Sequence, residues 1–176
     1  PEGTTVYNYD AVGLLSSLTK PNGTTVSYEY DAAHRLVAET DAQGNRRELE
    51  LNDLGNPVEE RLLDALGQTR WIEHRIFNEI GWLSSVSDAY SNQSSFSYDV
   101  VANLIQETSP SGNAHSYKYD GFHRRTQTTD PLGKVTQVLY KDTGDVYRVS
   151  DPRSRLTYYS YNGFGEVTQV RSPDTG

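Results

Sequence analysis

Aromatic and apolar residues alternate with polar residues in short segments along this chain. In one segment Tyr28 and Tyr30 flank Glu29, and the same arrangement returns over residues 117–119. A period of two places the aromatic side chains on one face of a strand and the polar side chains on the other. The pattern therefore predicts half-buried β-strands.

The strongest regularity is a pair of residues that we call the anchor pair, an aromatic or apolar anchor followed by Asp, Asn or, once, Lys. Successive anchors are separated by 21, 21, 26, 21, 21, 21 and 21 residues. The pairs are Tyr9-Asp10, Tyr30-Asp31, Leu51-Asn52, Phe77-Asn78, Tyr98-Asp99, Tyr119-Asp120, Tyr140-Lys141 and Tyr161-Asn162. This spacing indicates tandem repeats of one supersecondary unit.

Each unit contains two turn signals that would fold its strands into hairpins. The first turn opens at the second residue of the anchor pair, as in Asp10–Gly13, and the second often has Pro in its second place, as in Asp130–Gly133. Such sequences are typical of type I turns that close a short loop with a left-handed residue. His34, Ala102 and His123 stand in the glycine position of the first turn. We expect a left-handed backbone there despite its cost.

The third unit is five residues longer than the others, with two extra residues before its second turn and three after it. Both strands should lengthen, and this hairpin should project beyond its neighbours. The odd number after the turn would reverse the facing of side chains unless a bulge absorbs one residue. A helical turn through Val58, Leu62 and Leu66 is the alternative.

These observations predict an all-β fold of tandem antiparallel β-hairpin repeats that form a curved sheet of about sixteen strands, because large open sheets curl. Each hairpin would bury its aromatic face only beside its neighbours. We interpret residues 1–176 as a single tract of eight units and, since it opens at Pro1 in mid-repeat, as a fragment of a larger protein. Open sheet edges predict self-association.

Composition narrows the functional classes. The net charge of −8 comes from 16 basic and 24 acidic residues that are scattered along the chain, whereas a nucleic-acid binder needs a concentrated basic face. No apolar stretch approaches the roughly 18 residues of a membrane-spanning helix. The absence of cysteine excludes disulfides and thiolate chemistry. The 13 tyrosines suit a thin sheet, because the ring packs while the hydroxyl reaches water.

The histidines do not predict a metal site. His34 and His123 are expected as turn residues, and His74 and His115 lack a partner at the spacing of metal ligands. We therefore predict no metal and no cofactor.

The carboxylates and serines do not predict catalysis. Asp142 and Asp145 lack the alternating oxygen ligands and the distal Glu of a calcium loop. Glu59 and Glu60 are adjacent, so they should lie on opposite faces of a strand rather than across a cleft. No Gly-x-Ser-x-Gly elbow is present. We expect no catalytic residue.

Two tryptophans are the best candidates for contact with a ligand. Trp71 and Trp82 flank the long hairpin, and their rings could stack on a glycan or a protein partner. Packing within the sheet is the alternative role.

The sequences Tyr30-Asp31-Ala32-Ala33-His34-Arg35-Leu36 and Tyr119-Asp120-Gly121-Phe122-His123-Arg124 resemble the YD-repeat, or RHS-repeat, family. The resemblance covers the whole chain. Members of this family include bacterial polymorphic toxins, insecticidal toxin complexes and teneurins. It implies a long spiralling sheet that closes into a hollow shell. In the bacterial members the shell encloses a C-terminal toxin domain and often cleaves itself after the repeats.

Nothing in this chain matches such a cleavage core or a toxin domain. The resemblance therefore implies a structural wall segment of a secreted or cell-surface bacterial protein, whose partners are adjoining repeats and the toxin domain of the parent chain. A surface module that binds glycan or protein partners is the alternative.

Overall fold

The computed structural model describes residues 3–173, and every regular element within them is a β-strand. The strands are β1 (Val6–Tyr9), β2 (Leu15–Thr19), β3 (Thr25–Tyr30), β4 (Leu36–Thr40), β5 (Arg46–Leu51), β6 (Pro57–Leu63), β7 (Thr69–Phe77), β8 (Leu83–Asp88), β9 (Gln93–Tyr98), β10 (Leu104–Thr108), β11 (Ala114–Tyr119), β12 (Arg125–Thr129), β13 (Val135–Tyr140), β14 (Val146–Ser150), β15 (Leu156–Tyr161) and β16 (Val167–Arg171). A helix able to cross a membrane is absent from this part of the chain.

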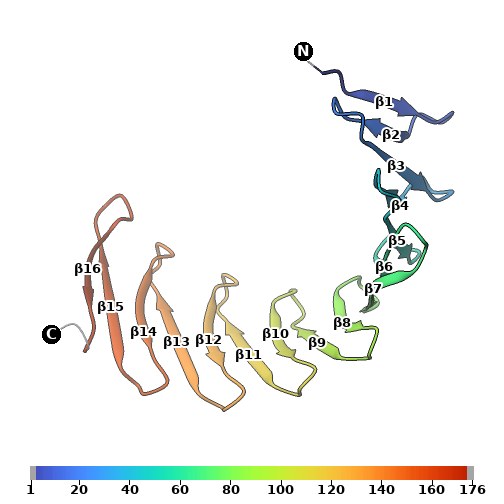
Figure 1. The fold of residues 1–176 in the computed structure, drawn as a ribbon. Coiled ribbons are helices and arrows are strands. Elements are labelled where there is room, and N and C mark those ends of the chain that lie inside the picture. Colours follow the sequence, from blue (N-terminus) through green and yellow to red (C-terminus); the bar gives the residue numbers. More distant parts are fainter. Residues whose placement is uncertain (1–2, 174–176) are drawn as a thin grey trace. The chain divides into compact units, whose positions relative to one another are not determined.

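The chain divides into two compact parts, Pro1–Gln93 and Ser94–Gly176, which we call the first unit and the second unit and which each contain several repeats. In the first unit β1 to β8 are hydrogen-bonded in chain order, and in the second β9 to β16 are paired in the same way. All of these pairs are antiparallel, so each unit is a succession of hairpins (Figure 1). The predicted all-β fold of tandem antiparallel hairpins is confirmed.

A β-bulge follows the first turn of every repeat within the described residues. In β3 and β4, Tyr30 pairs with Leu36 while Glu29 pairs with Ala38, so Val37 is an extra residue. The same shift occurs beside each of the other anchors. Because a bulge bends its strand and increases the local twist, the repeat carries its own bend.

The turns have the predicted backbone. His34, Ala102 and His123 have φ values of 64°, 70° and 62°, the left-handed conformation expected in the glycine position. Ser91 and Ser154 adopt the same conformation in the second turn, which the sequence pattern did not single out. Five of the described residues therefore accept a conformation that ordinarily favours glycine.

The long third hairpin is formed by β6 and β7, which contain seven and nine residues. Their register shifts between Leu62 and Leu63, so of the two outcomes left open by the odd insertion, a bulge that absorbs one residue is the one found. The helical alternative through Val58, Leu62 and Leu66 is wrong. The strand pairing with β5 and β8 on either side imposes the extended backbone on this segment.

The anchors of each unit lie on one face, which we call the anchor face. In the first unit Tyr28 is the strand partner of Glu39, and Glu39 is the strand partner of Arg47, so these side chains lie on one face. The anchor Leu51 follows Arg47 by four residues on β5 and therefore lies on the same face. The anchor side chains are half-buried except in β1, where Tyr9 is exposed. Burial is shallow throughout, because a single sheet layer is covered only by its own side chains.

The most deeply buried of the described residues lie on the opposite face. Ala38 and Ser85 are the two classed as buried, and both are small. Ala38 pairs with Glu29 and Glu48, which are polar and share its face. The sheet is therefore stabilised mainly by strand pairing and by side-chain contacts between repeats.

Candidate functional site

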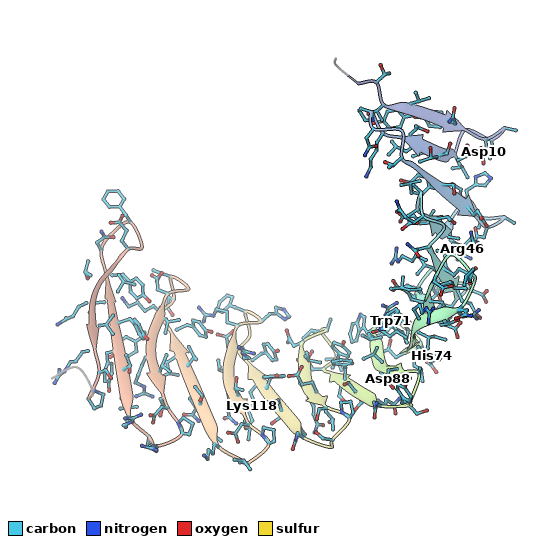
Figure 2. All side chains as sticks on the ribbon, in the orientation of Figure 1. Asp10, Arg46, Trp71, His74, Asp88 and Lys118 are labelled. Atoms are coloured by element: carbon cyan, nitrogen blue, oxygen red, sulfur yellow. The ribbon has the colours of Figure 1, made fainter. Side chains whose placement is uncertain are left out.

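The turn-opening carboxylate holds each first turn through backbone amides. Asp31 Oδ1 accepts hydrogen bonds from the amides of Ala33 and Arg35 at 2.9 Å, and Asp31 Oδ2 accepts one from Arg35 Nε at 2.7 Å. The hydrogen bond from the Arg35 amide is the main reason that the pKa of Asp31 lies below its usual value. Asp10 caps its turn in the same way without an arginine (Figure 2).

The same arrangement is present in the second unit. Asp120 accepts hydrogen bonds from the amides of Phe122 and Arg124 and from Arg124 Nε. The side-chain hydrogen bond from Arg124 is the first cause of its lowered pKa. Asp99 also has a lowered pKa, first because Asn103 donates its side-chain amide to it. The predicted turn role of Asp10, Asp31, Asp99 and Asp120 is thus accounted for by these hydrogen bonds.

The anchor tyrosines join successive repeats through their hydroxyls. Tyr119 donates a hydrogen bond of 2.8 Å to the carbonyl of Leu104, fifteen residues earlier. Leu104 pairs with Tyr98, the anchor of the preceding repeat. We call this contact the tyrosine tie. It also occurs from Tyr30 to Leu15, from Tyr140 to Arg125 and from Tyr161 to Val146.

Basic side chains of the first turn reach across to the next repeat. Arg35 Nη1 donates to the carbonyl of Asn52 at 2.9 Å, and Arg124 Nη1 donates to the carbonyl of Lys141 at 3.0 Å. The Arg124 guanidinium also lies 4.6 Å from the centre of the Tyr140 ring, within the range of a cation–π contact. Each such arginine therefore braces its own turn and the turn that follows.

The cation–π arrangement recurs one repeat later, where Lys141 Nζ lies 4.8 Å from the Tyr161 ring. Lys141 replaces the turn-opening Asp and so loses the carboxylate cap, yet its turn still closes through backbone hydrogen bonds to Asp145 and Gly144. This residue exchanges a contact within the turn for a contact between repeats.

Ion pairs replace tyrosine ties around the long hairpin. The anchors there are Leu51 and Phe77, which have no hydroxyl. On the anchor face, Glu60 contacts Arg47 at 2.7 Å and Arg75 at 3.0 Å. The hydrogen bond from Arg47 is the first cause of the lowered pKa of Glu60.

The opposite face of this hairpin has its own ion pairs. Glu59 contacts Arg61 and lies 3.0 Å from Nδ1 of His74, which is labelled on β7 in Figure 2. Glu59 and Glu60 therefore lie on opposite faces, as predicted, and each contacts at least one arginine. This geometry does not provide the two facing carboxylates of a glycosidase.

The two tryptophans do not form one platform. Trp71 lies near the start of β7 and is 39% exposed, and its strand partner is the exposed Leu62. Trp82 lies beyond the other end of β7, just before β8. Phe77, at the end of β7, is six positions after Trp71, or about 20 Å along an extended strand, and Trp82 lies beyond it. Contact of either tryptophan with a glycan or protein stays a prediction.

Trp82 has a position in the repeat that explains it structurally. Its amide donates to Asn78 Oδ1 and its carbonyl accepts the Asn78 amide. Arg35 and Arg124 make the same backbone contacts with Asp31 and Asp120. Trp82 therefore occupies the turn position from which those arginines brace the next repeat.

The histidines and the remaining carboxylates have local roles. His123 Nδ1 lies 3.0 Å from Asn103 Oδ1 of the preceding repeat, and Asp145 Oδ2 accepts a hydrogen bond from Thr143. Over residues 3–173 no group of three or more ligand-type side chains is placed to hold a metal ion.

Sequence reasoning missed the arginines that brace successive turns. Arg35 and Arg124 both follow their anchors by five residues, and the carbonyls that they reach lie seventeen residues further on. A comparison of this position among the repeats could have suggested a shared role. The bond to the next turn was not visible without the fold.

Comparisons with known proteins agree with this geometry. The RHS Repeat family model matches residues 9–46 and 103–135. No curated protein sequence matches the chain. Among solved structures, a TcdB2-TccC3-Cdc42 chain is similar over 97% of this chain, with 14% identity and a TM-score of 0.63.

Two further structures have the same fold. TcdB2-TccC3 without its hypervariable C-terminal region matches 97% of the chain with 16% identity and a TM-score of 0.62. The Photorhabdus luminescens Tc holotoxin pore matches 96% with 12% identity and a TM-score of 0.51. The present chain covers only 11% to 13% of the length of these proteins.

Proposed function

From the RHS repeats that this chain carries, we propose that it is a structural wall segment of a shell that encapsulates a C-terminal toxin domain in a secreted bacterial toxin. The observation that carries the proposal is the recurrent tyrosine tie, by which Tyr30, Tyr119, Tyr140 and Tyr161 each bond the repeat before their own. Side chains are used for joining repeats rather than for assembling a reactive centre. The similarity to Tc toxin chains supports the same role.

The proposed partners are the adjoining repeats and the toxin domain of the parent chain. The anchor face offers tyrosine rings together with polar residues such as Glu107 and His115, which are strand partners on β10 and β11. A mixed surface of this kind can contact an enclosed polypeptide without the strong adhesion of a continuous apolar patch. We propose secretion or exposure at the bacterial surface.

Protease protection of the parent protein tests encapsulation. Tyr119→Asp together with Tyr140→Asp would remove two ties and should make the C-terminal segment cleavable. Phe164→Asp is the matched control, since Phe164 is 92% exposed, and it should leave that segment protected. Cleavage of the C-terminal segment at the same rate in the unaltered parent and both variants would contradict enclosure.

A surface module that binds glycan or protein is the second candidate, favoured by the exposed pair of Trp71 and Leu62. Trp71→Thr should abolish glycan retention without changing the circular dichroism spectrum if this candidate is right. Unchanged retention would leave the wall segment as the function of this hairpin.

A further inference from the structure

One carboxylate on the anchor face of the second unit differs from its counterparts in the first. Glu107, on β10, follows its anchor by nine residues, as Glu39 and Glu60 do in their repeats. Glu39 is the strand partner of Arg47, and Glu60 contacts both Arg47 and Arg75. In the first unit, a carboxylate at this position of the repeat therefore has an arginine beside it.

Glu107 has a histidine in the place of that arginine. Its strand partner on β11 is His115, which precedes its anchor by four residues, as Arg47 does. Within residues 3–173, Glu107 forms no ion pair. Arginine is always charged, whereas histidine is mostly neutral at pH 7. The charge of Glu107 is therefore not balanced as that of Glu39 is.

A tyrosine positions the Glu107 carboxylate. The Tyr117 hydroxyl donates a hydrogen bond of 2.6 Å to Oε1 of Glu107. Burial and this hydrogen bond raise the pKa of Tyr117 to about 12, so the hydroxyl stays a donor at neutral pH. Arg125 lies over the Tyr117 ring, 5.2 Å from its centre, and does not pair with Glu107. The second carboxylate oxygen is thus the place for a further donor.

The carboxylate lines an open pocket of about 570 Å³. Phe96 on β9 is also a strand partner of Glu107, so Phe96, Glu107 and His115 form a row across three neighbouring strands (Figure 1). All three are half-buried, and directly opposed side chains start about 5 Å apart. The turn between β10 and β11 adds Ser109 and Asn113 to the lining. The pocket therefore combines an aromatic wall, a carboxylate and neutral hydrogen-bonding groups.

We propose that this pocket binds a lysine side chain of an extended polypeptide segment, and in naming this partner the inference rests on the proposed enclosure of a toxin domain. The ammonium would donate to the second oxygen of Glu107, and the methylene stem would pack on the Phe96 ring. Because Tyr117 already bonds one carboxylate oxygen, a compact ammonium fits better than the forked guanidinium of arginine. The net charge of −8 adds long-range attraction for a basic segment.

Calorimetric titration of the 176-residue chain tests the proposal. The probe is an acetylated and amidated peptide of alternating lysine and glycine, and the matched probe has norleucine in place of lysine, which keeps the stem and removes the charge. The lysine peptide should bind saturably, and the norleucine peptide should bind at least about tenfold more weakly. A failure here would leave the protease protection of the parent protein, which tests enclosure, unaffected.

Two substitutions in the pocket should weaken binding of the lysine peptide about tenfold. Glu107→Gln removes the charge but keeps an acceptor for Tyr117. His115→Arg supplies an internal cation, as Arg47 does in the first unit. His115→Thr is the matched control, since Thr136 occupies the equivalent position of the next repeat, and it should change the affinity by less than about twofold.

Asp142→Asn controls for the overall charge of the chain, because it removes a carboxylate from an exposed turn that does not line the pocket. It should also change the affinity by less than about twofold. Circular dichroism and melting curves establish that each variant is folded.

Four results would overturn the proposal: no saturable binding of the lysine peptide, equal binding of the norleucine peptide, a loss in Asp142→Asn equal to that in Glu107→Gln, or unchanged affinity in His115→Arg. Tighter binding of spermidine than of the lysine peptide would also overturn it, by showing a site for free polyamines.

Discussion

At the scale of single residues, tyrosine performs two tasks in the repeat. Its ring covers the half-buried anchor face, and its hydroxyl donates a hydrogen bond to a backbone carbonyl of the preceding repeat. That carbonyl belongs to the residue just before the bulge, where the regular ladder is interrupted. The hydroxyl thus satisfies an acceptor beside a local defect of the sheet.

Tyr119→Phe should lower the free energy of unfolding by about 1 kcal/mol, because the Leu104 carbonyl loses its donor while the ring is retained. Urea unfolding monitored by circular dichroism provides the measurement. Tyr9→Phe is the control, since the Tyr9 hydroxyl makes no tie within the described residues, and it should have little effect. Equal losses in both variants would show that the tie does not stabilise the fold.

Ala102→Gly should raise the free energy of unfolding by about 0.5–1 kcal/mol. Ala102 has a φ of 70°, and glycine adopts this conformation without the clash of a Cβ atom. Ala33→Gly, in a turn position without positive φ, should be neutral or destabilising. A lower melting temperature for Ala102→Gly would contradict the assignment of strain to this turn.

At the scale of elements, the long hairpin shows how a repeat can be enlarged without losing its register. The bulge at Leu62 and Leu63 keeps Glu60 and Trp71 on the anchor face. Glu60 and Glu73 are directly opposed on β6 and β7. Like charges in this arrangement are destabilising unless a cation lies between them.

Arg75 supplies that cation, with Nη2 lying 3.0 Å from Glu60 and 2.5 Å from Glu73. Arg75→Ala should lower the free energy of unfolding by about 1–2 kcal/mol, because two opposed carboxylates remain. Adding Glu73→Ala should recover part of the loss. A double-mutant cycle measured by urea unfolding distinguishes this from simple loss of packing, for which the two effects would add.

At the scale of the whole molecule, stability depends on contacts between neighbouring hairpins. In this chain β16 has a neighbouring strand on one side within the described residues, and Val167 and Val170 are 53% and 48% exposed. An uncovered strand edge offers backbone groups to another copy. We therefore predict that the 176-residue chain self-associates.

Val170→Lys should reduce this association, because a charged side chain on an edge strand opposes pairing. Val100→Lys is the matched control in an exposed turn and should leave it unchanged. Light scattering over a range of concentrations gives the measurement. A monodisperse monomer of the unaltered chain at high concentration would contradict the prediction.

The sequence by itself determined the hairpins, their turns and the face on which the anchors lie. These features depend on residues close together in the chain, such as Asp31 and His34 in one turn, or Tyr28 and Tyr30 in one strand. Turn chemistry and period-two alternation act at that range. Counting residues between the two turns of the long hairpin left two outcomes, a bulge or a reversed facing, and the strand register decided for the bulge.

Only the tertiary structure decided which repeats exchange which contacts. The ties span fifteen residues, the arginine contacts span seventeen, and Glu107 lies beside His115 through strand pairing. Whether such side chains touch depends on the bulge, the twist and the register of two adjoining strands together. Alternation within one strand does not specify these, because cross-strand neighbours are set by pairing register rather than by spacing along the chain.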